Sequence, residues 1–111
     1  MSAVADELIQ KMADTIVREV DPAQIILFGS RARGDADAHS DVDLLIVQDR
    51  PFSSLRGRLE QKGRLWRVLA KFGVPVDILM YAPDQLDKWR DSRNHVIGHA
   101  LREGKVVYER N

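Results

Sequence analysis

The hydrophobic positions of this chain follow helical spacing in some segments and strand spacing in others, in turn along the sequence. The opening segment predicts a helix over residues 2–20, with Ser2 as its N-cap and the pair Asp21 and Pro22 at its end. Its apolar positions recur at steps of four: Val4, Leu8, Met12, Ile16 and Val20.

Short apolar runs predict strands at residues 25–28, 42–47 and 75–80, and residues 105–109 predict a short strand or tail. Helices are expected over residues 54–72, 83–90 and 94–103, with Gly104 stopping the last of them as a C′ residue would. The expected apolar face of the second helix is made of Leu55, Leu59, Trp66, Leu69 and Phe72. Three or four strands on one side and helices on the other predict an α+β, or α/β two-layer, fold with a β-sheet packed by helices.

Length and composition narrow the class of protein. A chain of 111 residues fits one domain, taken as residues 1–111, and the absence of cysteine excludes disulfides and thiolate metal sites. No apolar run approaches the roughly 20 residues that span a membrane, and the polar residues 2–7 do not resemble a signal peptide. A cytoplasmic protein is therefore expected. A net charge of zero argues against direct nucleic-acid binding as its main activity.

The helix expected over residues 54–72 is strongly basic. It has a single acid, Glu60, and six cations: Arg56, Arg58, Lys62, Arg64, Arg67 and Lys71. Two interpretations stay open, a solvated helix face and a docking face for an acidic protein partner or a triphosphate tail. Trp66 and Trp89 lie at helical spacing with other apolar residues, so they are expected as core anchors or interface aromatics rather than nucleobase platforms.

The segment that carries candidate chemistry is Gly29-Ser30 followed by Asp41 and Asp43. Side chains alternate faces along a strand, so the two carboxylates point the same way about 7 Å apart. Their mutual repulsion favours a cation, and Mg²⁺ binds one or two carboxylates together with substrate phosphates. Gly29 lets the backbone approach a phosphate, and the Ser30 hydroxyl can donate to it.

These residues resemble the minimal nucleotidyltransferases of the DNA polymerase β superfamily, whose hallmark is Gly-Ser, ten residues and Asp-x-Asp. Here Gly29-Ser30 and Asp41-x-Asp43 fit without a gap, and Asp77, a lone charge in an apolar run, fits the family's third carboxylate. The resemblance implies a nucleotidyltransferase-like fold, with a mixed β-sheet packed by helices. It also implies two Mg²⁺ ions held by Asp41, Asp43 and Asp77, which are the catalytic residues, and a nucleoside triphosphate, ATP, at Gly29, Ser30, Arg33 and Ser40.

The resemblance further implies transfer of AMP from ATP to a hydroxyl of a partner protein. Family members of this kind are antitoxins of HEPN-domain ribonuclease toxins, and a homodimer or a hetero-oligomer with the toxin would follow. Two alternatives stay open. One is a non-catalytic binding module that neutralises the toxin by complex formation, and the other is nucleotide transfer to a small molecule such as an aminoglycoside.

Other polar residues near the motif have plainer expected roles. Arg31 and Arg33 are expected on the surface of a loop, with phosphate contact as the alternative. Asp35 and Asp37 are expected in that loop, and His39 has no second His or Cys at metal-ligand spacing, so it is not expected as a ligand. Residues 93–95 are expected to start a helix.

Overall fold

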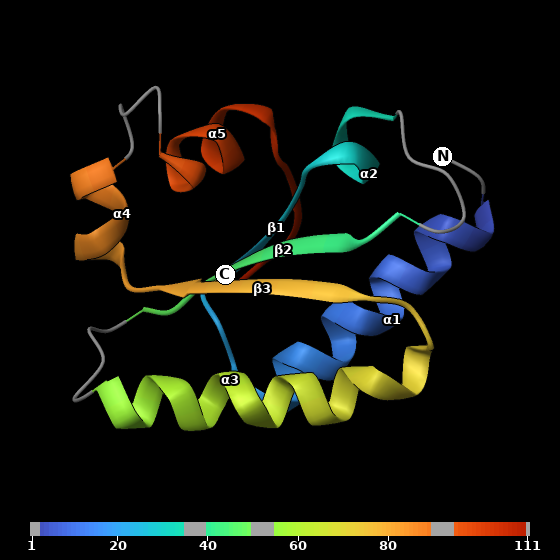
Figure 1. Cartoon of the computed structure of the whole chain (residues 1–111), viewed down its shortest axis with the longest axis horizontal. Coiled ribbons are helices and arrows are strands. Elements are labelled where there is room, and N and C mark those ends of the chain that lie inside the picture. The colour runs from blue at the N-terminus through green and yellow to red at the C-terminus, as the bar shows by residue number, and fades with distance from the viewer. Residues whose placement is uncertain (1–2, 35–39, 50–54, 90–94, 111) are drawn as a thin grey trace.

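The computed structural model describes residues 3–34, 40–49, 55–89 and 95–110, and it contains one four-stranded sheet (Figure 1). Its strands are β1 (Gln24–Phe28), β2 (Val42–Val47), β3 (Val76–Tyr81) and β4 (Lys105–Glu109), in the order β3-β2-β1-β4. β1 pairs antiparallel with both β2 and β4, whereas β2 pairs parallel with β3. The sheet is therefore mixed, and the expected segment 105–109 is a strand.

The helices are α1 (Ala3–Val20), α2 (Ser30–Arg33), α3 (Leu55–Leu69), α4 (Pro83–Trp89) and α5 (Val96–Glu103), and a 3₁₀ turn (Ala70–Phe72) follows α3. Four of these five helices match the expected segments closely. The exception is α2, a single helical turn where a loop was expected. Pro83 suits the first position of α4 because its missing N–H has no partner there in any helix. His95 caps α5, its Nδ1 accepting a hydrogen bond from the Ile97 amide at 3.1 Å, so the expected helix start at residues 93–95 is confirmed at His95, while Arg93 and Asn94 lie outside the described residues.

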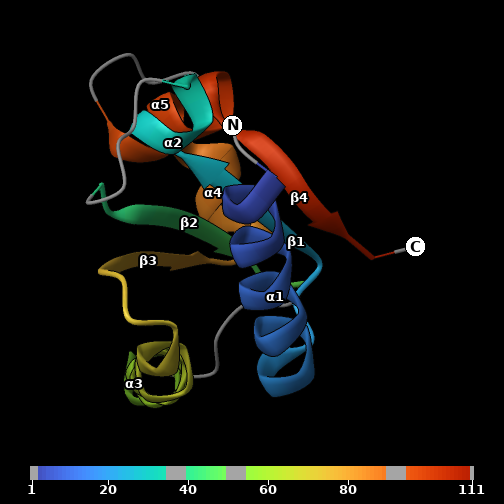
Figure 2. The same ribbon diagram turned by 90° about the vertical axis from the view of Figure 1, so that its right-hand side faces the viewer.

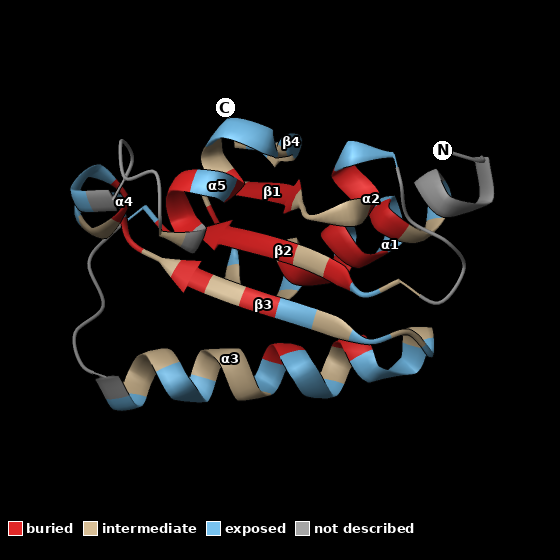
Figure 3. Ribbon diagram, turned by 45° about the horizontal axis from the view of Figure 1, so that its top comes forward, coloured by how far each residue is buried: buried red, intermediate tan, exposed pale blue. Residues whose placement is uncertain are grey.

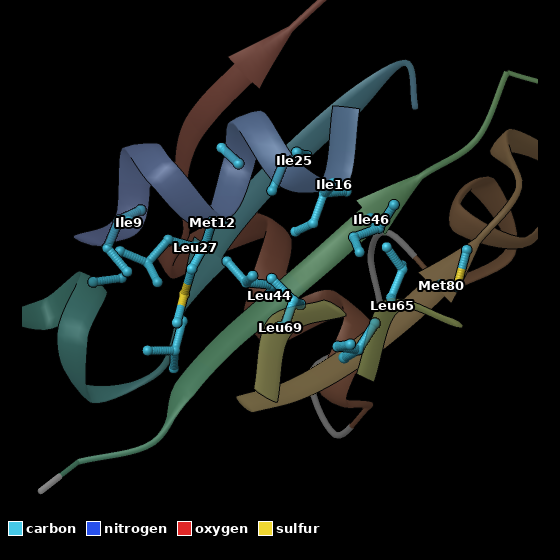
Figure 4. Packing of buried hydrophobic residues seen from close by; sticks show 14 residues of the cluster. Ile9, Met12, Ile16, Ile25, Leu27, Leu44, Ile46, Leu65, Leu69 and Met80 are labelled. Carbon is cyan, nitrogen blue, oxygen red and sulfur yellow. The ribbon is translucent and has the colours of Figure 1, made fainter. Parts of the chain in front are cut away.

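The larger part of the core lies between one face of the sheet and the helices α1 and α3. Leu44 and Ile46 of β2 point to this face and meet Leu65 and Leu69 of α3 and the apolar stripe of α1 (Figure 4). All four of these leucine and isoleucine side chains are at most 1% exposed. Alternation along β2 and helical spacing along α1 and α3 therefore converge on one buried interface.

The opposite face of the sheet is covered by α4 and α5. Leu45 and Val47 of β2 point to this side and pack with Leu86 of α4 and Ile97 of α5. Figure 2 shows α4 and α5 on one side of the sheet and α1 and α3 on the other. The expected α+β class with a mixed, helix-packed sheet is confirmed, but the helices lie on both faces rather than in the single layer expected.

The expected apolar face of the helix over residues 54–72 was wrong in part. Along α3, Leu59 and Trp66 are 58% and 52% exposed, so Trp66 is not a core anchor; Leu65 and Leu69 face the sheet instead. Gly104 ends α5 as expected, with φ −76°. A Cβ there would lie 2.4 Å from both the Ala100 carbonyl oxygen and the Ile26 side chain, so close packing of α5 on β1 is what excludes a side chain. In the part of the chain that the structure describes, no helix has the length and apolarity to cross a membrane.

Candidate active site

The candidate carboxylates lie at the end of the sheet where the parallel strands β2 and β3 begin. Asp43 pairs in register with Asp77, and strand alternation turns both toward the face that carries α4 and α5. That face is covered near Leu45 and Val47, further along β2, but not at the strand starts, where Asp43 is half-buried and Asp77 is exposed (Figure 3). The topology thus brings together two acids that are 34 positions apart in the sequence.

The electrostatics of Asp43 show how close this pair is. Burial, and then the negative charge of Asp77 together with a hydrogen bond to its side chain, raise the pKa of Asp43 to about 6. Asp41 adds a smaller effect in the same direction, and Arg33 opposes it. In the absence of a cation, Asp43 is therefore held in a place that disfavours its charged form.

Gly29, directly after β1, is shaped by its contact with Asp43. Its φ of +75° is a conformation that residues with a side chain rarely adopt, and a Cβ there would lie 2.2 Å from Asp43 Oδ2. The Gly29 carbonyl oxygen accepts hydrogen bonds from the backbone amides of Ala32 and Arg33, both at 3.1 Å, and these bonds begin α2. The absence of a side chain at Gly29 therefore lets the turn at Ser30 pack directly against the Asp43 carboxylate.

Arg31 is the residue whose place differs most from expectation, because it is buried rather than on a loop surface. Its side chain is 6% exposed, and Nε and Nη2 both donate to the Ser40 carbonyl oxygen, at 3.1 and 2.9 Å. Ser40 directly precedes Asp41, so this double hydrogen bond fastens α2 to the entry of β2. Arg31 is a positioning residue that sequence reasoning missed.

Arg33 lies on α2, with its side chain 48% exposed, and not in a loop as expected. It forms an ion pair with Glu103 of α5 at 3.5 Å, and it lowers the pKa of Asp43. It is thus a cation within electrostatic reach of the carboxylates. Ser30 and Ser40 are both half-buried beside this unit. Asp35, Asp37 and His39 lie outside the described residues.

Of the three predicted acids, two lie close together and the third contributes less. Among the residues described, no three acidic or imidazole side chains are gathered as a ready-made set of metal ligands. Asp43 and Asp77 form the close pair, and the exposed Asp41 acts on Asp43 through its charge. Two carboxylates fit Mg²⁺ nonetheless, because this ion completes its coordination with substrate phosphates and water.

The family of the chain follows from comparison with known proteins. Residues 9–103 match the model of the nucleotidyltransferase domain, so the chain belongs to this family. A protein of Methanocaldococcus jannaschii, named putative protein adenylyltransferase MJ0604, is 35% identical over 88 residues, which make up 77% of each chain.

Solved structures support the fold. A crystal structure of a putative nucleotidyltransferase from Sulfolobus solfataricus has a TM-score of 0.64 at 20% identity, covering 95% of this chain and 80% of that one. A structure of a putative minimal nucleotidyltransferase has a TM-score of 0.55 at 25% identity, covering 95% of both chains. A toxin-antitoxin crystal structure with AMP-PNP has a TM-score of 0.57 at 21% identity, covering 92% of this chain and 74% of that one.

Proposed function

We propose that this protein transfers AMP from ATP to a hydroxyl group of a partner protein. The observation that carries the proposal is the facing pair Asp43 and Asp77, with the Gly29-Ser30 turn packed directly against Asp43. A protein that needed only a stable fold would gain by neutral side chains there, since burial and repulsion disfavour the charge of Asp43. A bound cation would offset the unfavourable free energy of keeping Asp43 charged at this position.

Asp41, Asp43 and Asp77 are the proposed ligands of two Mg²⁺ ions, with Asp43 and Asp77 as the central pair. When bound, divalent metal would neutralise phosphate charge and stabilise both the attacking and the leaving oxygen. Gly29 and Ser30 would hold the phosphates through backbone amides and the Ser30 hydroxyl, at the N-terminal turn of α2. Arg33 adds a positive charge near Asp43, and Ser40, directly before Asp41, is the remaining proposed nucleotide-binding residue.

In the proposed reaction, the acceptor hydroxyl oxygen forms a bond to the α-phosphorus of ATP. The bond between that phosphorus and the oxygen bridging to the β-phosphate breaks, and pyrophosphate leaves with the bonding electrons. The hydroxyl proton passes to the exposed Asp77 carboxylate and then to water. Orientation by Gly29, Ser30 and the acids contributes much of the acceleration.

The proposed acceptor is a toxin of the HEPN ribonuclease class, which the AMP would neutralise inside the cytoplasm. Two observations support a protein acceptor. The relative MJ0604 is named a protein adenylyltransferase, and the structural neighbour with AMP-PNP is a toxin-antitoxin complex. The residues that the structure describes form one sheet with its covering helices, and they build no separate acceptor-binding domain.

The test is incubation of the protein with Mg²⁺, ATP labelled at the α-phosphate and the protein encoded beside it, followed by intact mass. We expect the neighbour to gain the mass of one AMP, and the double substitution Asp41→Asn with Asp43→Asn to abolish the gain. Asp14→Asn, an exposed acid on α1, is the matched control. Association without any AMP transfer would replace this proposal with the binding-only function.

A further inference from the structure

The outer side of α3 carries an exposed apolar stripe. Three large hydrophobic side chains are prominently exposed among the described residues, and two of them, Leu59 at 58% and Trp66 at 52%, are on this helix. They are seven positions apart, or nearly two helical turns, so they point in the same direction. Leu65 and Leu69 already pack α3 onto the sheet, so the stripe has no role in the core.

Positive charge surrounds this stripe. Lys62, one turn before Trp66, places its ammonium 5.4 Å from the centre of the indole ring. Arg67 and Arg64 are exposed next to it, and the only acid on α3, Glu60, pairs with Arg56 at 3.3 Å. In a chain with a net charge of zero, this concentration on one helix is a local property of α3.

The stripe lies next to the edge of the sheet that carries Asp77. Arg58, one turn before Lys62, stacks on the ring of Tyr81 at the end of β3, 4.7 Å from the ring centre. Arg58, Lys62 and Trp66 are successive i,i+4 neighbours along α3, and Figure 2 shows α3 beneath β3 at the edge of the sheet. Tyr81 and Asp77 are about 13 Å apart along β3.

From these contacts we infer that the Leu59–Trp66 stripe of α3 is a docking surface for an acidic, amphipathic segment of a partner protein. Apolar side chains of the partner would cover Leu59 and Trp66, and its carboxylates would meet the surrounding cations. The inference deepens the proposed function and rests on it in one respect, that the docked protein is the acceptor. The docked protein would lie beside Asp77 while leaving the Gly29-Ser30 turn open to ATP.

A protein fits this surface better than RNA does. The aliphatic Leu59 offers neither a stacking face nor a hydrogen bond to a nucleotide, and Lys62 already lies over one face of the Trp66 ring. Exposed tryptophan and arginine beside an aliphatic contact are typical of the centres of protein interfaces. Surface cations around them favour an acidic partner.

The test is photo-crosslinking from position 59 in the organism's own cells, with position 106 as the control. Val106 is as exposed as Trp66, at 52%, but it lies on β4 at the opposite edge of the sheet. The protein crosslinked at position 59 and not at 106 is then identified and purified, and its affinity is measured by calorimetry. The variants Trp66→Ser and Arg67→Glu are compared with the controls Val106→Ser and Lys105→Glu, each checked for an unchanged melting temperature.

We expect the identified protein to bind about tenfold or more weakly to each α3 variant and with unchanged affinity to each control. A nuclease-sensitive adduct, a crosslink to a second copy of this chain, no adduct above the level at position 106, or unchanged affinity of the α3 variants would overturn the inference. Binding that depends on α3 without AMP transfer would leave the docking surface in place and remove the proposed function. AMP transfer to the identified protein with an unchanged KM for that protein in Trp66→Ser would leave the proposed function in place and remove the docking surface.

Discussion

The two faces of the sheet are both covered by helices, but only one is covered along its full length. Under α1 and α3, Leu44 and Ile46 of β2 are at most 1% exposed, and no charge of β2 or β3 points to that face. On the other face, α4 and α5 cover Leu45 and Val47 but leave Asp43 half-buried and Asp77 exposed. The difference indicates that the face under α1 and α3 stabilises the fold, whereas the uncovered end of the other face keeps a carboxylate where its charged form is disfavoured.

The largest expected effect is on the free energy of unfolding, when a buried side chain under α1 and α3 is truncated. Leu44→Ala removes a side chain that is 1% exposed, and we expect it to lower the free energy of unfolding by about 2–5 kcal/mol. Asp43→Asn, the preceding residue of β2, should cause no such loss. Urea denaturation of the two variants measures this. Equal destabilisation by both would contradict the division into two faces.

Gly29→Ala should have the next largest effect, because it combines backbone strain with a displaced carboxylate. The strain of φ +75° and the contact with Asp43 Oδ2 together should cost about 1–3 kcal/mol and weaken Mn²⁺ binding. Gly34→Ala is the matched control, since Gly34 has φ +84° and a Cβ added there would meet nothing within 4 Å. Calorimetric Mn²⁺ titration separates them, and similar metal affinities for both would show that the Gly29 contact does not shape the site.

Arg31→Lys should be milder, because a positive charge remains and only the forked donation to Ser40 is lost. We expect Mn²⁺ affinity to fall about tenfold through misplacement of Asp41, with the fold retained. Arg56→Lys, at an exposed position of α3, is the control. Unchanged metal affinity in Arg31→Lys would mean that the clamp serves the fold alone.

The smallest effect concerns pH. The pKa of Asp43 is about 6, above its ordinary value of 3.8, so the folded protein binds this proton more tightly than the unfolded chain does. The stability that the neutral form contributes is complete below pH 3.8 and is lost as the pH rises through 6. In metal-free buffer, Asp43→Asn should therefore melt above the wild-type protein at pH 7.5 and close to it at pH 4. Asp14→Asn, at an exposed acid of α1, should show no such pH-dependent difference in melting temperature. A wild-type protein that is more stable than the Asp43→Asn variant at pH 7.5 would contradict the cause assigned to the pKa shift.

The strands and most helices could be predicted from sequence because their periodicity is strong and their ends carry Pro, Gly or polar residues. The side of α3 that packs on the sheet could not be predicted from sequence. Its sequence contains two apolar stripes, one with Leu59 and Trp66 and one with Leu65 and Leu69, and only packing against β3 and α1 selects the second. The same holds for the covering of both faces, because β2 is apolar on its two sides and its sequence does not say which helix covers which side.

At the site, alternation along β2 predicted that Asp41 and Asp43 share a face, and the parallel pairing of β2 with β3 adds that Asp77 lies opposite Asp43. The buried Arg31 had no such signal. Its acceptor is the carbonyl oxygen of Ser40, nine positions further along the chain. A backbone acceptor leaves no mark in the sequence, so an arginine beside a Gly-Ser turn is expected at the surface. The roles of the acids in binding metal and nucleotide remain predictions.

The most direct test of the central claim is a Mn²⁺ titration of the protein with a non-hydrolysable ATP analogue, followed by amide signals in NMR spectra. Paramagnetic broadening should concentrate at Gly29, Ser30, Asp43 and Asp77, spare α3, and disappear in Asp43→Asn. Broadening centred on α3 or α1, or broadening at the strand starts that persists unchanged in Asp43→Asn, would contradict the assignment of this end of the sheet as the metal and nucleotide site.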